Sequence, residues 1–463
     1  MKRRDFLKST LLSSAALAIA PGTLRATCAP SDLLFFSIQA SGAWDPTYLC
    51  DPHADEFFTF YQNEHIATAT TANGQISYAP FELNGDTPVY YQVGGQDFFQ
   101  KHKNRLLIIN GVDTGTVSHP VGARHVFSGS VREVRPNLGA MVAGFRGPSM
   151  PLAFVSNGGF DSSQGLVPVS RVNNPAFLHD LALPNRVVPA NDASTQLFHD
   201  TAVESLLAEA QNQRDIALLE RLRLPVQQRA IEQVQHARLS AENLSILAEE
   251  EALRRGNNSN PAIDALDTVL AAMRTGICAA AHVKNNNFDT HSEHDSMVLG
   301  TGHRPSLRRL LETLDYLIES FESDPVLSAR GALVLVGSDF ARTRYNRATD
   351  DPENGKDHWP TTSMMVFALG SAADRVHGGR VLGRTRTRNA QNEPYPGVQA
   401  ESWVLENDIM RLADAGETGA FALQPAHIMH ALQHEMGICD PETLERFPLE
   451  TGFEAPLPLL RMS

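Results

Sequence analysis

The chain lacks the features that mark several classes of protein. It has four cysteines in 463 residues, too few and too scattered for a disulfide framework. If the chain is exported, the pair we consider is Cys28 with Cys50, and free buried thiols are the alternative. No apolar run beyond the first 26 residues is long enough to span a bilayer. Basic residues are scarce, since residues 27–463 hold 34 Lys and Arg against 52 Asp and Glu, a net charge of −18. We therefore expect neither nucleic acid nor anionic lipid as a partner.

The first 26 residues have the composition of an export signal. A basic start is followed by an apolar run over residues 11–20 and by small residues before a cleavage point after Ala26. The pair Arg3-Arg4, followed by Asp-Phe-Leu-Lys, resembles the twin-arginine signal, whose pathway exports folded proteins and often serves those loaded with a metal or cofactor. We predict a twin-arginine signal peptide over 1–26 and a periplasmic or secreted protein. An uncleaved signal that anchors the chain is the alternative.

Residues 27–463 are predicted to form one α/β domain. At 42% hydrophobic content the chain can bury a large core. Short apolar runs bounded by turn residues predict buried strands, and helical spacing predicts helices between them. The predicted strands cover 32–38, 105–110, 151–155, 276–283, 332–336 and 364–369, and the predicted helices include 137–145, 304–323, 404–413 and 426–436.

Residues 200–256 are predicted to be a helical insertion in this domain. Apolar residues recur there at helical spacing with charged residues between them, interrupted near Pro225. This pattern predicts two amphipathic helices that form a hairpin over the sheet. A structural cap is the favoured interpretation, and a lid or a partner-binding element is the alternative.

Six residues with polar side chains lie next to predicted strands or at a predicted helix start. Carboxyl ends of parallel strands meet at one edge of an open sheet, where ligands bind. Carboxylate and imidazole groups together are typical ligands of divalent metals in hydrolytic sites. The six are Asp45, Ser118, Asp289, His291, Asp339 and His358. They predict one site, although a solvated polar loop over 284–295 is an alternative explanation for two of them.

The segment around Ser118 adds a possible nucleophile. Pro120 is tolerated in the first turn of a helix, which places Ser118 or His119 at the N-cap. A hydroxyl there lies in the positive field of the helix, which favours a bound anion or an ionised nucleophile. A plain N-cap serine is the alternative. Arg124 or Arg342 would add a guanidinium to a bound anion, so the set suits hydrolysis of a phosphate or sulfate ester.

Three motifs resemble a known family. The twin-arginine start, FDTHSEH at 288–294, and GSDFART at 337–343 with ENGKDHWP at 353–360 resemble the secreted bacterial family called domain of unknown function 1501. The resemblance spans nearly the whole chain and implies the alkaline phosphatase and sulfatase fold, a central, mostly parallel sheet with helices on both faces. It also implies a role for each site residue. Asp45 would be the N-terminal metal aspartate, Ser118 the nucleophile with Arg124 nearby, Asp289, His291 and His358 the ligands of one metal, and Asp339 a ligand of the other.

The chain departs from that superfamily at three positions. Phe340 stands where a histidine usually follows the aspartate, one residue rather than three separates Asp289 from His291, and position 118 is not cysteine. The last departure disfavours a conventional sulfatase. We expect an exported hydrolase of anionic small-molecule or polymer esters that uses one or two divalent ions (zinc, manganese, calcium or magnesium). The alternative is a non-catalytic envelope protein that keeps the phosphatase-like fold to bind an anionic ligand or a protein partner.

Overall fold

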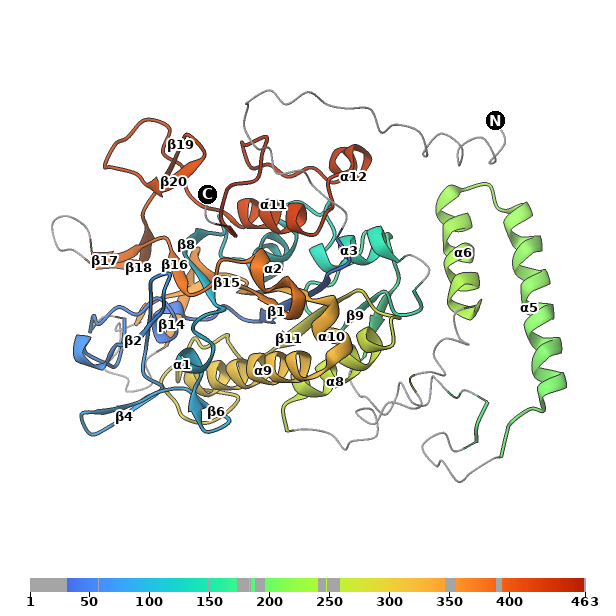
Figure 1. Ribbon diagram of the computed structural model, residues 1–463, viewed down its shortest axis with the longest axis horizontal. Helices are drawn as coiled ribbons and strands as arrows, with labels where there is room; N and C mark the ends of the chain where they lie inside the picture. The colour runs from blue at the N-terminus through green and yellow to red at the C-terminus, as the bar shows by residue number, and fades with distance from the viewer. Residues whose placement is uncertain are drawn as a thin grey trace.

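The fold is organised around an eight-stranded sheet, seen in the computed structural model of Figure 1. The strand order is β10-β9-β11-β1-β12-β15-β8-β16. The strands are β1 (Leu34–Ala40), β8 (Leu107–Asp113), β9 (Phe154–Ser156), β10 (Val169–Arg171), β11 (Ala280–Asn285), β12 (Ala332–Ser338), β15 (Thr361–Leu369) and β16 (Arg380–Leu382). β1, β12 and β15 are buried along their whole length, which explains why they appear in the sequence as unbroken apolar runs.

The structure describes residues 31–56, 58–147, 150–172, 183, 185–187, 196–239, 247, 259–345, 355–388 and 394–461. The predicted signal peptide at 1–26, Cys28 and most of the insertion beyond residue 239 lie outside this part of the chain. Within it, no helix combines the length and apolarity needed to cross a bilayer.

One strand of the sheet, β15, runs opposite to the others, and its direction determines which residues meet at the edge of the sheet. β15 pairs antiparallel with both β12 and β8, whereas the other neighbouring pairs are parallel. The start of β15 therefore lies at the edge where β1, β11 and β12 end. The residues that precede β15 meet the residues that follow the parallel strands.

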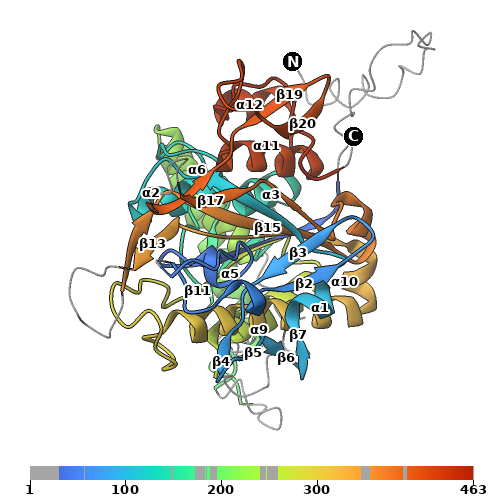
Figure 2. The same cartoon turned by 90° about the vertical axis from the view of Figure 1, so that its left-hand side faces the viewer.

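Helices cover both faces of the sheet, as Figure 2 shows edge-on. Phe36 and Val334 point to the face packed by α8 and α9, and Phe35 and Leu335 point to the face packed by α2, α3 and α11. The helices are α1 (Phe98–His102), α2 (His119–Ser128), α3 (Leu138–Arg146), α5 (Thr201–Arg221), α6 (Pro225–Leu239), α8 (Pro261–Arg274), α9 (His303–Ser323), α10 (Pro325–Arg330), α11 (Pro425–Glu435) and α12 (Pro441–Arg446). The prediction of an α/β domain with a mostly parallel sheet and helices is confirmed.

Among the described residues, six small two-stranded sheets lie outside the central sheet. They are β2 (Ala67–Thr70) with β3 (Gln75–Tyr78), β4 (Glu82–Asn84) with β5 (Thr87–Val89), β6 (Gln92–Val93) with β7 (Gln96–Asp97), β13 (Ala341–Tyr345) with β14 (Lys356–Trp359), β17 (Thr385–Arg388) with β18 (Pro394–Ala400), and β19 (Trp403–Glu406) with β20 (Ile409–Leu412). The last pair covers most of residues 404–413, where the sequence predicts a helix, so that prediction is wrong. Asn407 and Asp408 adopt φ values of 50° and 63°, the left-handed conformation that a tight hairpin turn requires.

Two further predictions are corrected. The insertion forms α5 and α6, but α5 is exposed along most of its length and the hairpin stands to one side of the sheet rather than over it (Figure 1). Cys50 is a free, buried thiol, so its pairing with Cys28 is wrong. Cys278 is also free, whereas Cys439 is disulfide-bonded.

Candidate metal centre

Two short segments supply much of the site, and in each a buried side chain lies next to an exposed one. In the first, Asp289 and His291 are exposed and Thr290 between them is buried. In the second, which is β14, Lys356 is fully buried and Asp357 is exposed. Residues 289–291 follow the two-residue alternation of extended chain, whereas in β14 the adjacent Asp357 and His358 both contact the outer group. The backbone N–H of Lys356 donates to the carbonyl of Thr290 at 3.3 Å and holds the two segments together.

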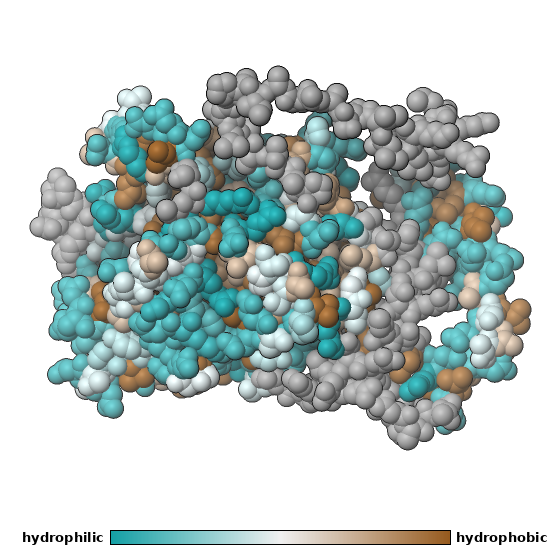
Figure 3. Space-filling view, viewed as in Figure 1, coloured by the Kyte–Doolittle hydropathy of each residue, from teal (hydrophilic) through white to brown (hydrophobic). Residues whose placement is uncertain are grey.

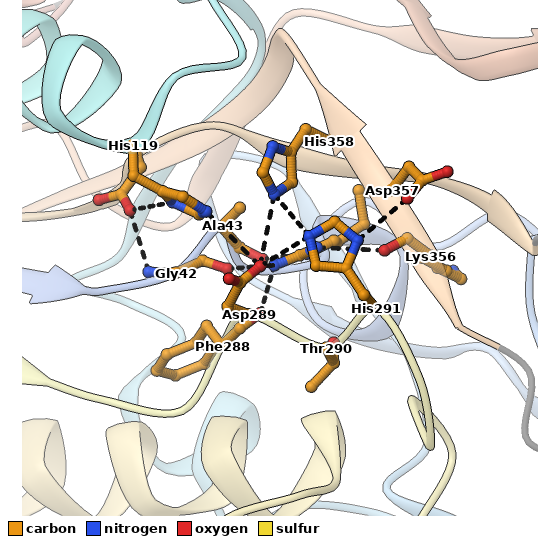
Figure 4. A network of polar contacts seen from close by, with 12 residues as sticks. Gly42, Ala43, His119, Phe288, Asp289, Thr290, His291, Lys356, Asp357 and His358 are labelled. Carbon is orange, nitrogen blue, oxygen red and sulfur yellow. Dashed lines mark hydrogen bonds and ion pairs between the residues drawn. The ribbon is translucent and has the colours of Figure 1, made fainter.

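The side chains at this edge of the sheet form two groups. The outer cluster faces solvent and contains His119, Asp289, His291, Asp357 and His358, most of them labelled in Figure 4. The inner cluster is buried beneath it and contains Asp45, Thr290, His294, His303 and Lys356.

Three imidazole rings of the outer cluster converge on one carboxylate oxygen. The Oδ1 atom of Asp289 lies 3.5 Å from Nε2 of His119, 3.2 Å from Nε2 of His291 and 3.3 Å from Nε2 of His358. The Nε2 atoms of His291 and His358 are 2.9 Å apart. Figure 4 shows the rings arranged around Asp289, each from a different segment of the chain: α2, the loop after β11, and β14.

The other nitrogen of each ring fixes the tautomer. Nδ1 of His119 lies 2.9 Å from a carboxylate oxygen of Asp339. Nδ1 of His291 lies 3.0 Å from a carboxylate oxygen of Asp357, and Nδ1 of His358 lies 3.0 Å from the carbonyl oxygen of Val117. These oxygens only accept hydrogen bonds, so in the neutral rings Nδ1 carries the proton and Nε2 presents a lone pair.

Three lone pairs therefore surround an anionic oxygen that accepts its hydrogen bond from Arg342, and the three Nε2 atoms have no proton to share among them. Consistently, Nε2 of His119 is buried and has no hydrogen-bond partner. A cation between these atoms would satisfy all of them. Metal-binding histidines commonly donate their second N–H to a carboxylate or a carbonyl, as all three do here. His119, Asp289 and His358 have ligand atoms close enough to hold one ion, and His291 lies beside them. The residues fit a divalent metal.

Arg342 anchors the carboxylate at the centre. Its Nη2 atom donates to Oδ1 of Asp289 at 2.6 Å, and the rest of the buried guanidinium donates to the carbonyls of Gly42, Ala43, Phe288 and Lys356. Burial raises the pKa of Asp289, but the Arg342 hydrogen bond and charge outweigh it and lower that pKa to about 2. Arg342 thus keeps Asp289 ionised and is not free to bind an external anion.

A comparison with models of protein families identifies the family of this chain. The family model described as "Protein of unknown function (DUF1501)" matches residues 96–396. The chain belongs to this family. A search of curated proteins gives no match. The matched region of this DUF1501 protein includes the whole outer cluster, whereas Asp45 lies before it.

Asp339 lies behind the outer cluster rather than at a second metal position. Its buried carboxylate accepts from Nε2 of Gln39 at 2.8 Å, from the N–H of Gly42 at 3.0 Å and from His119. The ring of Phe340 lies 4.7 Å from that of His119 and 4.6 Å from that of His358. Asp339 therefore orients His119. Its carboxylate oxygens are occupied by these hydrogen bonds rather than directed at a second ion.

Asp45 belongs to the inner cluster. Its carboxylate accepts from Nζ of Lys356 at 2.5 Å and from Thr47, and lies 3.2 Å from Nε2 of His294. Burial raises the pKa of Asp45, but the Lys356 charge and His294 outweigh it, and the net shift is downward. The predicted metal aspartate thus binds a buried lysine in this DUF1501 protein.

The rest of the inner cluster is satisfied by hydrogen bonds. His294 and His303 stack with ring centroids 4.4 Å apart, and Oγ1 of Thr290 lies 2.7 and 3.0 Å from their Nδ1 atoms. Nε2 of His303 accepts from the N–H of Asp45 at 2.7 Å. Burial lowers the pKa of both histidines, that of His294 to about 4. They are neutral, hydrogen-bonded parts of the interior.

Of the two predicted catalytic residues, only Ser118 lies beside the outer cluster. It is exposed at the N-cap of α2, its hydroxyl does not cap the helix, and its neighbours Val117 and His119 both contact the cluster. The Arg124 side chain instead donates to the carbonyl of Val131 at 2.8 Å and to Glu133 at 2.6 Å. These contacts occupy the Arg124 guanidinium, and its predicted role beside a bound anion stays a prediction.

His119 is the residue of the outer cluster that the sequence does not single out as a metal ligand. Its sequence pattern predicts only a helix start, although it follows the same strand end as Ser118. A second group, His102 with Asp315 and Glu319, also has metal-like spacing. There Lys101 binds Asp315 at 2.7 Å and Glu319 at 3.1 Å, so an ammonium already supplies the cation. We interpret that group as ion pairing between α1 and α9.

Proposed function

We propose that this DUF1501 protein is an exported, metal-dependent hydrolase of phosphate or related esters, with one divalent ion held by His119, Asp289, His291 and His358. The observation that carries the proposal is the convergence of three imidazole Nε2 lone pairs on Oδ1 of Asp289. Imidazole-rich sites favour zinc over calcium and magnesium, which prefer sites built from oxygen ligands. Among the four predicted metals, zinc is therefore the expected ion.

The bound ion would polarise the ester and lower the pKa of the attacking hydroxyl. Ser118 is the nucleophile in this proposal. Its Oγ loses its proton to solvent and forms a bond to phosphorus while the ester P–O bond breaks, and the departing alkoxide takes up a proton from solvent. Water then cleaves the phosphoserine, which releases phosphate and regenerates the serine hydroxyl. The N-terminus of α2 favours the anionic group beside Ser118. Neither arginine binds the substrate anion in this proposal, because Arg124 is bound to Glu133 and Arg342 to Asp289 and to backbone carbonyls.

The exposure of the site supports an ester carried by a large or extended molecule. The side chains of Asp289 and His291 are 49% and 47% exposed, and Ser118 is exposed next to them. Such an open centre admits a polymer as well as a small molecule. The twin-arginine start supports export of a folded, metal-loaded chain, and the mostly parallel sheet with the site at its carboxyl edge supports the phosphatase-like fold.

Metal analysis tests the proposal directly. The purified mature protein is expected to hold about one zinc per chain, and Asp289→Asn and His358→Ala should remove it while the circular dichroism spectrum stays unchanged. Chromogenic phosphate and sulfate esters should be hydrolysed only by the loaded protein, and Ser118→Ala should abolish turnover with zinc retained. Arg124→Gln serves as the matched control. Metal-free wild-type protein, or turnover indifferent to Asp289→Asn, contradicts the proposal.

One observation favours the second candidate, a non-catalytic envelope protein that binds an anion or a protein. Asp339 is satisfied by internal hydrogen bonds and Phe340 packs on two rings of the cluster, so the second metal of a two-metal phosphatase has no ligands here. Stoichiometric zinc and phosphate binding without turnover of any ester would select this candidate.

A further inference from the structure

Gln39, on β1, is a buried amide that lies between the carboxylate of Asp339 and the ring of His282. Polar side chains are mostly found on the surface, as the largely hydrophilic face in Figure 3 shows, but Gln39 is only 2% exposed. Its Nε2 donates to Oδ1 of Asp339 at 2.8 Å, and its Oε1 lies 3.0 Å from Nε2 of His282. The same Oε1 accepts from the backbone N–H of Phe160 at 3.1 Å. Both ends of the amide are therefore bound.

These partners fix the orientation of the amide. A carboxylate only accepts hydrogen bonds and a backbone N–H only donates, so Nε2 faces Asp339 and Oε1 faces Phe160. Nε2 of His282 must then carry the proton that it donates to Gln39, and its Nδ1 accepts from Oγ of Ser37 at 2.8 Å. Reversing the amide would set Oε1 against the carboxylate and the NH2 group against the N–H of Phe160. The chain of hydrogen bonds therefore has one direction, toward Asp339.

The chain continues from Asp339 into the outer cluster. Oδ2 of Asp339 accepts from the N–H of Gly42 at 3.0 Å and lies 2.9 Å from Nδ1 of His119, while Oδ1 is held by Gln39. The carboxylate cannot rotate without breaking one of these bonds. The proton on Nδ1 of His119 is what leaves the Nε2 lone pair facing Oδ1 of Asp289. The setting of the Gln39 amide is thus transmitted to a proposed metal ligand.

Gly159, in the loop after β9, approaches the amide so closely that a larger residue does not fit. Its φ of 87° is the left-handed conformation that favours glycine. A Cβ atom at this position would overlap Oε1 of Gln39 and lie 2.8 Å from Nε2 of His282. The next residue, Phe160, supplies the N–H that binds Oε1. The loop therefore holds the amide on its oxygen side, while Asp339 holds it on its nitrogen side.

We propose that Gln39, held by the loop at Gly159 and Phe160, is a positioning residue that fixes Asp339 and, through it, the metal ligand His119. Gln39 acts through the carboxylate rather than on the ion. The inference rests on the metal site of the proposed function and does not depend on ester hydrolysis.

Zinc affinity tests this role. Gln39→Met removes the amide at similar volume and should raise the dissociation constant for zinc about threefold to tenfold, less than a group that binds the ligand ring directly. Competition with a chromogenic chelator measures it. The matched control is Gln433→Met, because Gln433 is 1% exposed and bound at both ends, to Arg135 and to the carbonyl of Ile438, without a hydrogen bond to the outer cluster. Its affinity for zinc should equal that of the wild type.

A pair of glycine variants tests the loop without removing a polar group. Gly159→Ala should displace the amide and weaken zinc binding to a similar degree. Gly165→Ala is the control, since Gly165 has a φ of 74° and is strained in the same way by a side chain, but no atom lies within 4 Å of the added Cβ. Circular dichroism checks that both variants remain folded. Equal zinc affinity in the two variants contradicts the role of the loop.

Two further measurements separate positioning from general support of the fold. In an Asp339→Ala background, Gln39→Met should no longer weaken zinc binding, because the residue through which it acts is gone. An effect of equal size in both backgrounds overturns the proposal. Nitrogen NMR of the metal-free protein, at a pH where the ring is neutral, should show the Nδ1–H tautomer of His119 in the wild type and a mixture of tautomers in Gln39→Met.

The outcomes distinguish this inference from the proposed function. A wild type that binds zinc, with Gln39→Met unaltered in affinity, overturns the role of Gln39 and leaves the proposed function intact. A wild type without zinc contradicts the proposed function, and the tautomer of His119 then decides whether Gln39 positions that ring. The same tautomer in wild type and Gln39→Met overturns the positioning role.

Discussion

The inner and outer clusters both contain histidine and aspartate, lie next to each other and differ in what their nitrogen atoms face. In the inner cluster, Lys356 meets Asp45, and the hydroxyl of Thr290 bridges two rings. In the outer cluster, three Nε2 atoms face one carboxylate oxygen. The comparison teaches that histidine and aspartate content does not distinguish a structural network from a metal site. The two kinds of site are distinguished by whether the hydrogen-bond donors match the lone pairs that face them.

The largest expected effect comes from breaking the inner cluster. Lys356→Met removes the cation from a carboxylate that is almost completely buried and should lower the free energy of unfolding by about 3–5 kcal/mol. Urea denaturation measures the loss. The double variant Lys356→Met with Asp45→Asn should regain part of it, since the uncompensated charge is gone. A single variant as stable as the wild type would show that the pair does not stabilise the fold.

The outer cluster should respond in affinity rather than in stability. Asp357 is half exposed and binds Nδ1 of His291, so Asp357→Ala should weaken metal binding by about 10- to 100-fold and leave unfolding nearly unchanged. Competition with a chromogenic zinc chelator measures the affinity. An unaltered affinity would remove His291 from the proposed ligand set.

His282, which lies in neither cluster, sharpens the comparison because its ring is buried and hydrogen-bonded but forms no direct ion pair with a described residue. Burial lowers the pKa of His282 to about 4. Its unfolded pKa is near 6.5, so the unfolded chain binds more protons between pH 6.5 and 4, and stability falls as the pH falls through that window. From pH 7 to pH 5 this one group should cost about 2 kcal/mol.

Urea denaturation at the two pH values measures that loss. His282→Gln should show a loss smaller by about the same amount, because glutamine does not titrate. Ring contacts with Ser37, Gln39 and Asn137 are partly replaceable by an amide. Equal pH dependence in wild type and variant would show that His282 is not the group responsible.

The smallest effect is expected at Arg124, which lies in neither cluster. Its ion pair is with Glu133, whose side chain is 80% exposed, so Arg124→Gln should change the unfolding free energy by less than about 1 kcal/mol. Ester turnover should stay within twofold of the wild type. A hundredfold loss of turnover would reinstate Arg124 as an anion-binding residue and weaken the assignment of the site to the outer cluster.

The fold was predictable where local sequence and tertiary burial agree. The apolar run predicted over 332–336 lies within β12, and the helix predicted over 304–323 is α9 within one residue, because both bury the pattern that defines them. The segment 404–413 fails because its apolar residues suit a helix as well as a strand. The left-handed turn at Asn407 and Asp408 decides for a hairpin.

The sequence alone determined which segments carry acidic and imidazole groups to one edge of the sheet, because strand ends follow from local burial patterns. It placed Asp289, His291 and His358 in a single site, and the structure brings their side chains together. Only the tertiary structure decided that His119 joins them, that Asp339 supports His119, and that Asp45 turns inward to Lys356. The physical reason is that the direction of a side chain and its partners depend on what packs against its segment, and those neighbours are distant in the sequence.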